Sequence, residues 1–351
     1  MEHFIKYVNI HNFKSIADLK LEDCRRINLF IGYPNVGKSN VLEALGLFSI
    51  SFLDETENLN KLVRAENKNE LFYNAIVKTS EIETDLSRIS LFNDTPKLRI
   101  FQDEWNNCIN YLFTSTLDLY STMTDSNPAW VPERKTIPPE IRKYSFQPKI
   151  QWKPDDRFSF DEFDESLLPP FGENIIGVLS NNPNVSDVKA WMKQEFAKFG
   201  LEYVLDKSSN SLKMQRRLGN DEVFQLPYSS LADTLQRVIF YKTAIASNKN
   251  SVLLFEEPEA HAFPPYISTL MQDVIEAESN QFFIVTHSPI IVNAFLEYEH
   301  LRRETSIYLF DYKNDQTTVK RLSDEEMDEV YEYGEDLFWG IEKFLDEEYG
   351  I

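Results

Sequence analysis

The stretch Gly32-Tyr33-Pro34-Asn35-Val36-Gly37-Lys38-Ser39 decides the fold, because it matches the pattern G-x-x-x-x-G-K-[ST] in full. Glycines let the backbone turn with its N–H groups pointing inward, so this segment is expected to wrap around phosphate oxygens. The apolar run INLFIG at 27–32 precedes it and predicts a buried strand. Apolar residues at helical spacing follow it and predict a helix from Lys38 to about Ile50.

The residue types in this loop predict how a nucleoside triphosphate would bind. Lys38 is expected to neutralise the β- and γ-phosphates, and Ser39 is expected to ligate Mg²⁺. The positive N-terminal end of the following helix would add to binding. We therefore predict ATP and Mg²⁺ as ligands, with GTP left open, and the loop residues that form the site are Gly32, Asn35, Val36, Gly37, Lys38, Ser39 and Asn40.

A second apolar run, VLLF at 252–255, ends in the adjacent acids Glu256 and Glu257. It predicts a buried strand that delivers both carboxylates to the carboxyl edge of an α/β sheet, where ligands bind. Glu256 is expected to hold Mg²⁺, and Glu257 to orient or deprotonate the attacking water. Two acids at a strand end are by themselves typical of ordinary structure, and the phosphate loop upstream is what favours the catalytic interpretation.

A third run, QFFIVTHS at 281–288, predicts another buried strand followed by His287. This histidine is expected to sense the γ-phosphate and to help place the water. A lone histidine is more often structural than catalytic. Its position one strand after the glutamate pair favours the catalytic role.

Buried strands and helices alternate towards the end of the chain, which predicts an α/β fold with a largely parallel sheet. We divide the chain into residues 1–54, 55–225, 226–300 and 301–351. In the second region we expect strands at 71–77 and 98–101 and a helix at 104–119. The proline-rich stretch 127–154 within it is expected to be a surface insertion or a contact for nucleic acid or a partner, with Arg142 and Lys149 as candidate DNA contacts.

The charge of the 351-residue chain is −21 and is unevenly distributed. Residues 322–351 hold 12 Asp or Glu and one Lys, a net charge of −11, which leaves −10 for the other 321 residues. Local nucleic-acid contact therefore stays open, and 323–349 is expected to be a solvated or partner-facing surface. The two cysteines, the lack of a signal-peptide pattern and the lack of an 18-residue apolar run predict a cytoplasmic protein that is not inserted in a membrane.

Four motifs occur in a telling order: N-F-K-S-I at 12–16, the phosphate loop, L-L-F-E-E-P-E-A-H at 253–261 and T-H-S-P at 286–289. Together they resemble the heads of ABC-type ATPases, most closely the overcoming-lysogenization-defect (OLD) and SMC-like branch. The resemblance covers residues 1–50 and about 226–300. It implies a P-loop NTPase fold with a mixed sheet, similar to an ABC ATPase head, and an inserted α/β or helical region at 55–225.

The resemblance also implies a signature serine that binds the γ-phosphate held by the partner subunit. The candidate segment is 228–237, in which Ser229 or Ser230 would serve, and Ser230 is our choice. The segment lacks the glycine that is usual in the family, which puts the closeness of backbone approach in question. A glutamine is expected to contact the site as well, with Gln102 as a candidate, and His261 is expected to face the other subunit.

The predicted function is that of an ATP hydrolase that forms a homodimer or higher oligomer around ATP and controls a separate effector protein. The effector would be a nuclease in a phage-defence system. The 63 residues after Ser288 are fewer than the roughly 100 of an OLD-type Toprim nuclease domain, so we expect no nuclease activity in this chain. The alternatives are a nucleotide-dependent scaffold with little turnover and a DNA-associated repair or maintenance ATPase.

Overall fold

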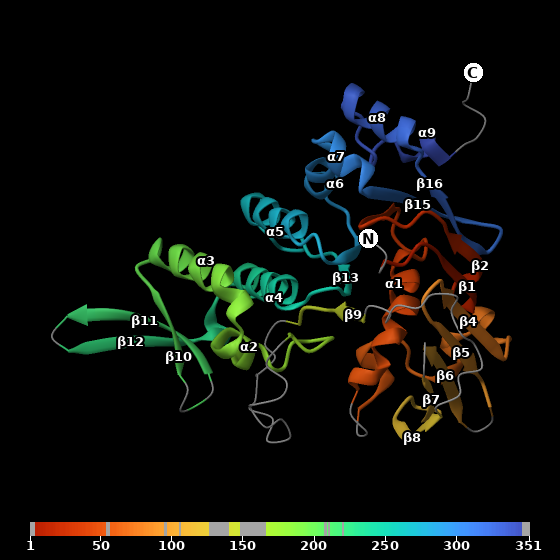
Figure 1. Cartoon of the computed structure of the whole chain (residues 1–351), viewed down its shortest axis with the longest axis horizontal. Helices are drawn as coiled ribbons and strands as arrows, with labels where there is room; N and C mark the ends of the chain where they lie inside the picture. The colour runs from red at the N-terminus through yellow and green to blue at the C-terminus, as the bar shows by residue number, and fades with distance from the viewer. Residues whose placement is uncertain are drawn as a thin grey trace. The chain divides into compact units, whose positions relative to one another are not determined.

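The computed structural model describes residues 4–53, 57–94, 97–104, 107–125, 140–147, 166–206, 209, 211–219 and 221–345. They fold into two compact units, shown in Figure 1. The first unit consists of Met1–Lys143, Asn250–Glu257 and Asn280–Ile351, and the second of Tyr144–Lys249 and Pro258–Ser279. The four regions defined from the sequence follow other boundaries, and their separate roles stay a prediction.

A six-stranded mixed sheet forms the centre of the first unit, counted over the described residues. Its parallel strands β15, β3, β14 and β13 are adjacent in that order, and β16 pairs antiparallel with β15 at one edge. The mixed α/β fold expected from the sequence is thus confirmed. From one edge to the other the strands are β16 (Gln316–Arg321), β15 (Thr305–Lys313), β3 (Ile27–Gly32), β14 (Gln281–Val285), β13 (Val252–Glu256) and β9 (Ile141–Tyr144).

Helix α1 (Lys38–Gly46) packs against the strands β3 and β14, which are mostly apolar. Every residue of both strands is buried, because parallel strands in α/β folds are covered on both faces. The α1 helix contacts β3, β13 and β14 on one side and β1 (Val8–Phe13) on another. A six-residue 3-10 helix at Leu47–Phe52 extends α1, in place of the α-helix expected up to Ile50.

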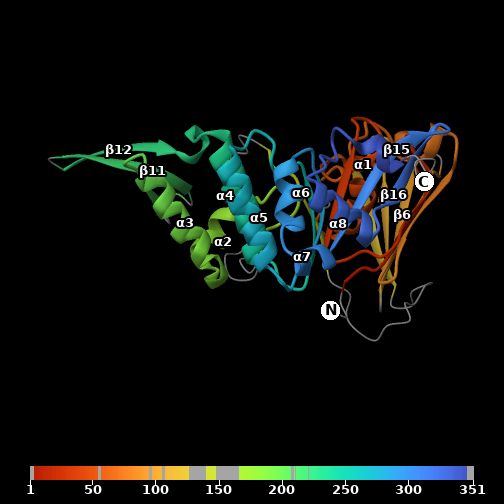
Figure 2. The same ribbon diagram turned by 90° about the horizontal axis from the view of Figure 1, so that it is seen from above.

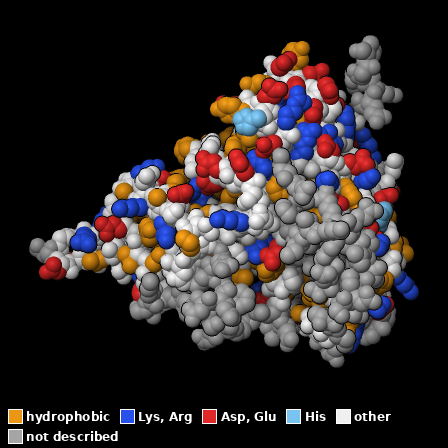
Figure 3. Space-filling model, in the orientation of Figure 1, with side chains coloured by type: hydrophobic (Ala, Val, Ile, Leu, Met, Phe, Trp, Pro, Cys, Tyr) orange, Lys and Arg blue, Asp and Glu red, His pale blue; other side chains and the backbone are white. Residues whose placement is uncertain are grey.

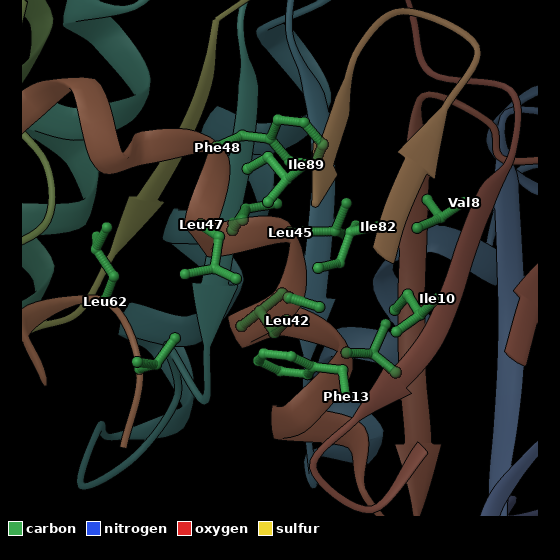
Figure 4. Packing of buried hydrophobic residues seen from close by; sticks show 14 of the residues in the cluster. Val8, Ile10, Phe13, Leu42, Leu45, Leu47, Phe48, Leu62, Ile82 and Ile89 are labelled. Atoms are coloured by element: carbon green, nitrogen blue, oxygen red, sulfur yellow. The ribbon is translucent and has the colours of Figure 1, made fainter. Parts of the chain in front are cut away.

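A second sheet of the first unit is antiparallel and has seven strands among the described residues. Figure 4 shows how its side chains, such as Ile10 and Ile82, pack together with Leu42 and Leu45 of α1 in one core. The strands in order are β2 (Ile16–Leu21), β1, β4 (Thr79–Thr84), β5 (Arg88–Phe92), β6 (Leu98–Glu104), β7 (Asn107–Phe113) and β8 (Leu119–Asp125). Because α1 lies between two sheets, the loop that precedes it is held from both sides.

The C-terminal part of the first unit carries four helices: α6 (Pro289–Leu296), α7 (Glu299–Arg303), α8 (Asp324–Tyr333) and α9 (Ile341–Leu345). Ser323 begins α8 with a capping box, in which its hydroxyl accepts from the Glu326 amide and the Glu326 carboxylate accepts from the Ser323 amide. Gly334, at a φ of 64°, ends the helix. Helix α9 is attached by the buried side chains of Ile341 and Phe344.

The second unit is built from helices and a small antiparallel sheet. Helix α4 (Asp233–Ser247) contacts α2 (Ile175–Asn181), α3 (Ser186–Ala197) and α5 (Pro264–Glu276). Figure 2 shows α4 and α5 side by side. The three-stranded sheet has the order β10 (Glu202–Asp206), β11 (Ser211–Gly219) and β12 (Glu222–Pro227).

Two secondary-structure expectations in the middle of the chain are wrong. The described residues of 104–119 form the end of β6, all of β7 and the start of β8, with a turn between β7 and β8, instead of a helix, because their apolar side chains continue the core of the antiparallel sheet. Residues 71–77 contain turns of 3-10 helix, at Lys68–Leu71 and Tyr73–Ala75, instead of a strand. The strand expected at 98–101 is confirmed as β6. None of the helices in the described ranges combines the length and the apolar character that crossing a membrane requires.

Candidate nucleotide-binding site

Three loops meet at the carboxyl edge of the six-stranded sheet. The strand β14 lies between β3 and β13 and runs parallel to both, so all three end on the same side. The phosphate loop follows β3, the segment with His287 follows β14, and Glu257 follows β13. This topology brings together the three motifs that the sequence singled out, although the phosphate loop is more than 200 residues from the other two in the chain.

The backbone of the phosphate loop turns at Asn35 and Gly37, which have φ values of 65° and 98°. Asn tolerates this left-handed region better than most side chains, and glycine adopts it without strain. Gly37 is the N-cap of α1, and no side chain caps the helix there. The backbone N–H groups of the first turn are therefore the natural partners of an anion.

Packing against the β15–β16 hairpin requires glycine at both ends of the loop. A Cβ atom on Gly32 would lie 2.5 Å from the carbonyl oxygen of Phe310, and one on Gly37 would lie 2.1 Å from Oγ1 of Thr317. Contacts this short do not occur, so any side chain at either position would displace the loop. The glycines of the motif thus serve the close approach of the loop to its own fold as well as to a ligand.

Lys38 has a buried side chain inside the loop. Its Nζ donates to the carbonyl oxygens of Gly32 at 2.8 Å and Tyr33 at 2.7 Å. Burial lowers the pKa of Lys38 to about 8, against the opposing effect of the Glu257 carboxylate. The ammonium group is therefore a desolvated cation, and an anion in the loop would interact with it strongly.

The other predicted loop residues have different environments. Val36 is buried and can contribute only its backbone. Ser39 lies in the first turn of α1, and its hydroxyl is of the oxygen type that Mg²⁺ prefers. Asn40 donates its amide to Oγ of Ser15 at 2.7 Å, and that oxygen also bonds Oγ1 of Thr317 at 2.7 Å. These contacts give Asn40 a role in bracing the loop.

Glu257 and His287 lie within reach of each other. Their Oε1 and Nε2 atoms are 3.5 Å apart, and both side chains are partly exposed, at 47% and 40%. The backbone of Glu257 has a φ of 43°, a strained region for this residue type that is enriched at functional sites. Burial and the charge of Lys38 lower the pKa of His287 despite the nearby Glu257 carboxylate, so the imidazole is neutral at pH 7.

Glu256 ends β13 and is paired with a residue that the sequence did not single out. Its Oε1 accepts from Nη2 of Arg64 at 2.7 Å. The same guanidinium donates through Nε to the buried carboxylate of Glu43 on α1, at 2.6 Å. No motif marks Arg64 or Glu43, and the only local signal is that Glu43 is an acid on the otherwise apolar face of the predicted helix.

The candidate signature segment belongs to the second unit. Ser230 lies in the 3-10 turn Tyr228–Ser230, three residues before Asp233, the first residue of α4. Asp233 is an acid in the first turn of the helix, and no side chain caps the helix N-terminus. The hydroxyl of Thr234 donates to the carbonyl of His261 at 2.6 Å, which joins the start of α4 to the segment after the glutamate pair.

Two further candidates are not brought to the sheet edge. Gln102 lies inside β6 with 1% of its surface exposed, so it has no surface to offer a nucleotide. Arg142 is a buried residue of β9 whose guanidinium donates to Glu140 at 2.9 Å and stacks on Phe52. This corrects its assignment as a DNA contact, because an ion pair in the sheet already holds it. Lys149 lies outside the described residues.

Comparisons with known proteins agree with this geometry. A family model described as "AAA domain, putative AbiEii toxin, Type IV TA system" matches residues 27–293, from the start of β3 to α6. The DNA replication and repair protein RecF of Clostridium kluyveri is 29% identical over 100 residues, which are 28% of this chain and 24% of that protein. The uncharacterized protein MJECL10 of Methanocaldococcus jannaschii is 48% identical over 44 residues, 12% of this chain and 20% of its own length. The chain thus matches a quarter or less of each relative.

Solved structures with a similar fold are heads of SMC proteins. The head bound to the C-winged helix domain of ScpA superposes with a TM-score of 0.50 at 13% identity, over 94% of this chain and 99% of that one. An Smc head domain with an extended coiled coil, bound to the C-terminal domain of ScpA derived from Pyrococcus furiosus, gives 0.52 at 11% identity, with the same coverage. At these identities the likeness shows the fold. Because the family model covers more than half of the sequence, the chain belongs to the AAA-domain family of putative AbiEii toxins of type IV toxin–antitoxin systems, whose P-loop ATPase fold it shares.

Proposed function

We propose that this protein binds ATP with Mg²⁺ in the phosphate loop, hydrolyses it, and couples the reaction to a partner protein in the cytoplasm. One observation carries the proposal: a buried lysine, a strained glutamate and a neutral histidine converge at the carboxyl edge of one sheet. Titratable groups gathered at the carboxyl edge of an α/β sheet, two of them with shifted pKa values, are typical of catalytic sites. Family membership supports the same activity.

The residues divide the chemistry among themselves. Lys38 and the backbone N–H groups of the loop bind the phosphates, and Ser39 and Glu256 offer the hard oxygen ligands that fit Mg²⁺. The metal ion would neutralise charge that develops on the phosphate oxygens. Glu257 accepts a proton from the attacking water, and His287, being neutral, orients the water without adding a charge.

Dimerisation around ATP is the second part of the proposal. Ser230 and the uncapped N-terminus of α4 would bind the γ-phosphate held by another copy of the chain. Closure of two copies then requires the γ-phosphate, so hydrolysis opens the dimer again. The SMC heads with the same fold are described in complex with ScpA, which supports a head of this type acting on a partner protein.

The acidic C-terminal surface is the proposed contact for that effector. Trp339 is 91% exposed and Tyr333 is 74% exposed, next to the acids of α8. In Figure 3, acidic, basic and apolar side chains are interleaved over these helices. The hydroxyl of Tyr33 in the phosphate loop donates to Glu342 of α9 at 3.3 Å, so this surface touches the loop directly. The toxin family name supports a role in phage defence. A nuclease as the effector is part of the same proposal.

The variant Glu257→Gln tests the proposal. Removing a general base lowers the turnover rate by about 10²- to 10⁴-fold, while the phosphate contacts are kept. We therefore expect normal ATP affinity by calorimetry, loss of phosphate release, and an ATP-dependent dimer by light scattering that persists. The matched control is Glu259→Gln, two residues further along and outside the sheet. Wild-type turnover in Glu257→Gln would refute the assignment of the base, and no binding of ATP or GTP by the wild-type protein would refute the function.

DNA-associated repair is a second candidate, favoured by the local similarity to RecF. It predicts that duplex DNA stimulates ATP hydrolysis at low salt and that the effect falls steeply as salt is added. Absence of any stimulation at low ionic strength would remove this candidate and leave the effector proposal.

A further inference from the structure

Four charged side chains form a continuous chain from the N-terminal N-F-K-S-I motif to the glutamate at the end of β13. Lys14, in the turn between β1 and β2, pairs with Glu43 of α1. The carboxylate of Glu43 also accepts from Nε of Arg64 at 2.6 Å, and Nη2 of Arg64 reaches Oε1 of Glu256 at 2.7 Å. These ion pairs thus connect the N-F-K-S-I motif, which has no assigned role, to the Glu256 carboxylate, which we propose holds Mg²⁺.

Glu43 anchors this series of ion pairs, because its side chain is buried on α1. Its side chain is 1% exposed, and burial by itself would raise its pKa, but the charges of Lys14 and Lys143 and the bonds from Lys14 and Arg64 outweigh burial and lower it. The acid is therefore ionised at neutral pH. Because it lies on α1, one helical turn after Ser39, it moves as one body with the phosphate loop.

Arg64 links the buried Glu43 to Glu256. Its side chain is 63% exposed, yet its guanidinium is held at two points by carboxylates from two different elements. A guanidinium is planar and presents its donors as a rigid fork, so binding Glu43 through Nε sets where Nη2 lies. The position of the Glu256 carboxylate therefore depends on α1 and the phosphate loop as well as on β13.

We propose that Arg64 is a positioning residue for the metal ligand Glu256, with Glu43 and Lys14 as its anchor. This inference rests on the proposed function, which assigns Glu256 to Mg²⁺. Residues that hydrogen-bond to a metal-ligating carboxylate set its orientation, and removing them lowers metal affinity about 10- to 100-fold. The N-F-K-S-I motif then acts on the metal site through Glu43 and Arg64.

The variants Arg64→Ala and Arg64→Lys separate this role from general stability. We expect the Mn²⁺ concentration that half-saturates the protein in the presence of a non-hydrolysable ATP analogue, followed by electron paramagnetic resonance, to rise about 10- to 100-fold in Arg64→Ala. The half-saturating Mn²⁺ concentration of Arg64→Lys should lie between those of the wild type and Arg64→Ala, because one ammonium group cannot bridge both carboxylates in the same way. Binding of the analogue in EDTA is unchanged, since no phosphate contact is removed.

Arg88→Ala is the matched control, because Arg88 forms a similar arginine–glutamate pair with Glu81 between β4 and β5. Its Mn²⁺ affinity should equal that of the wild type. Glu43→Gln should behave like Arg64→Ala, and the double variant should lose no more than either alone, because both break one chain. If Glu43→Gln fails to fold, the Arg64 series alone decides.

Two outcomes would overturn the inference. One is a Mn²⁺ affinity in Arg64→Ala within twofold of the wild type, and the other is a tighter affinity, which would mean that Arg64 competes with the metal. In both, the wild-type protein still binds nucleotide and metal. Failure of the proposed function is distinguishable, because the wild-type protein itself would then bind no metal–nucleotide complex.

Discussion

Replacing Gly37 by alanine should cost about 3–6 kcal/mol of folding free energy, and the structure shows where this energy arises. The φ of 98° is unfavourable for a residue with a Cβ atom, by about 1–2 kcal/mol. The new Cβ would also lie 2.1 Å from Oγ1 and 2.9 Å from Cγ2 of Thr317, an overlap of the kind that costs about 1–3 kcal/mol. Moving Thr317 aside further breaks its bond to Ser15, worth about 1 kcal/mol.

A double-mutant cycle divides this cost into its parts. Thr317→Ala removes Oγ1 and Cγ2, so in the Gly37→Ala background it should relieve the clash with Thr317. About 1–2 kcal/mol of backbone strain would remain, together with the 2.9 Å contact between the new Cβ and Oγ of Ser15. Urea denaturation without nucleotide measures all four proteins. A Gly37→Ala variant within 0.5 kcal/mol of the wild type would refute the argument. So would a cycle with no coupling between the two positions, since the clash would then not exist.

Three further expectations concern the same loop. Nucleotide affinity should fall as the pH rises from 7 to 9.5, because burial lowers the pKa of Lys38 to about 8 and the side chain loses its charge over this range. Nucleotide binding near pH 8 should therefore be accompanied by proton uptake, which calorimetry in buffers of different ionisation enthalpy would detect. Lys38→Met should abolish both the pH dependence and the proton uptake. Glu342→Gln, which removes an exposed negative charge bonded to Tyr33, should strengthen triphosphate binding about two- to fivefold at low salt and not at 0.5 M salt; an equal gain at both would contradict a charge effect. Asn35→Ala should lower the free energy of unfolding by about 1 kcal/mol and Asn35→Gly should leave it nearly unchanged, a contrast that the φ of 65° requires and that urea denaturation would measure.

The same burial of Lys38 has a consequence for stability. A lysine whose pKa is lower in the folded than in the unfolded protein opposes folding while it is charged, so its cost is fully present below pH 8. As the pH rises through 8 towards 10.5, the folded form loses the proton first and the cost disappears. The loop therefore maintains a cation that weakens the fold at the pH at which it would bind phosphate.

The sequence alone determined the sheet edge and the chemistry of the site. Predominantly apolar runs at 27–32, 252–255 and 281–285 predict buried parallel strands, because such strands are covered on both faces. Since parallel strands end on the same side, the loop with Lys38, the acid Glu257 and His287 had to come together. The phosphate loop could also be predicted from the sequence, because few other motifs combine two glycines at this spacing with Lys and Ser.

The tertiary structure decided what no local pattern encodes. Buried and less buried residues alternate in β4 and β5, but β7 has the sequence NCINYLF, with apolar residues at adjacent positions, and the segment that contains it therefore resembled a helix. Arg64 became part of the site only because the chain folds back between α1 and β13, so that one guanidinium reaches acids 21 and 192 positions away. Long-range pairing of charges depends on which elements pack together, and a sequence records those charges without recording their partners.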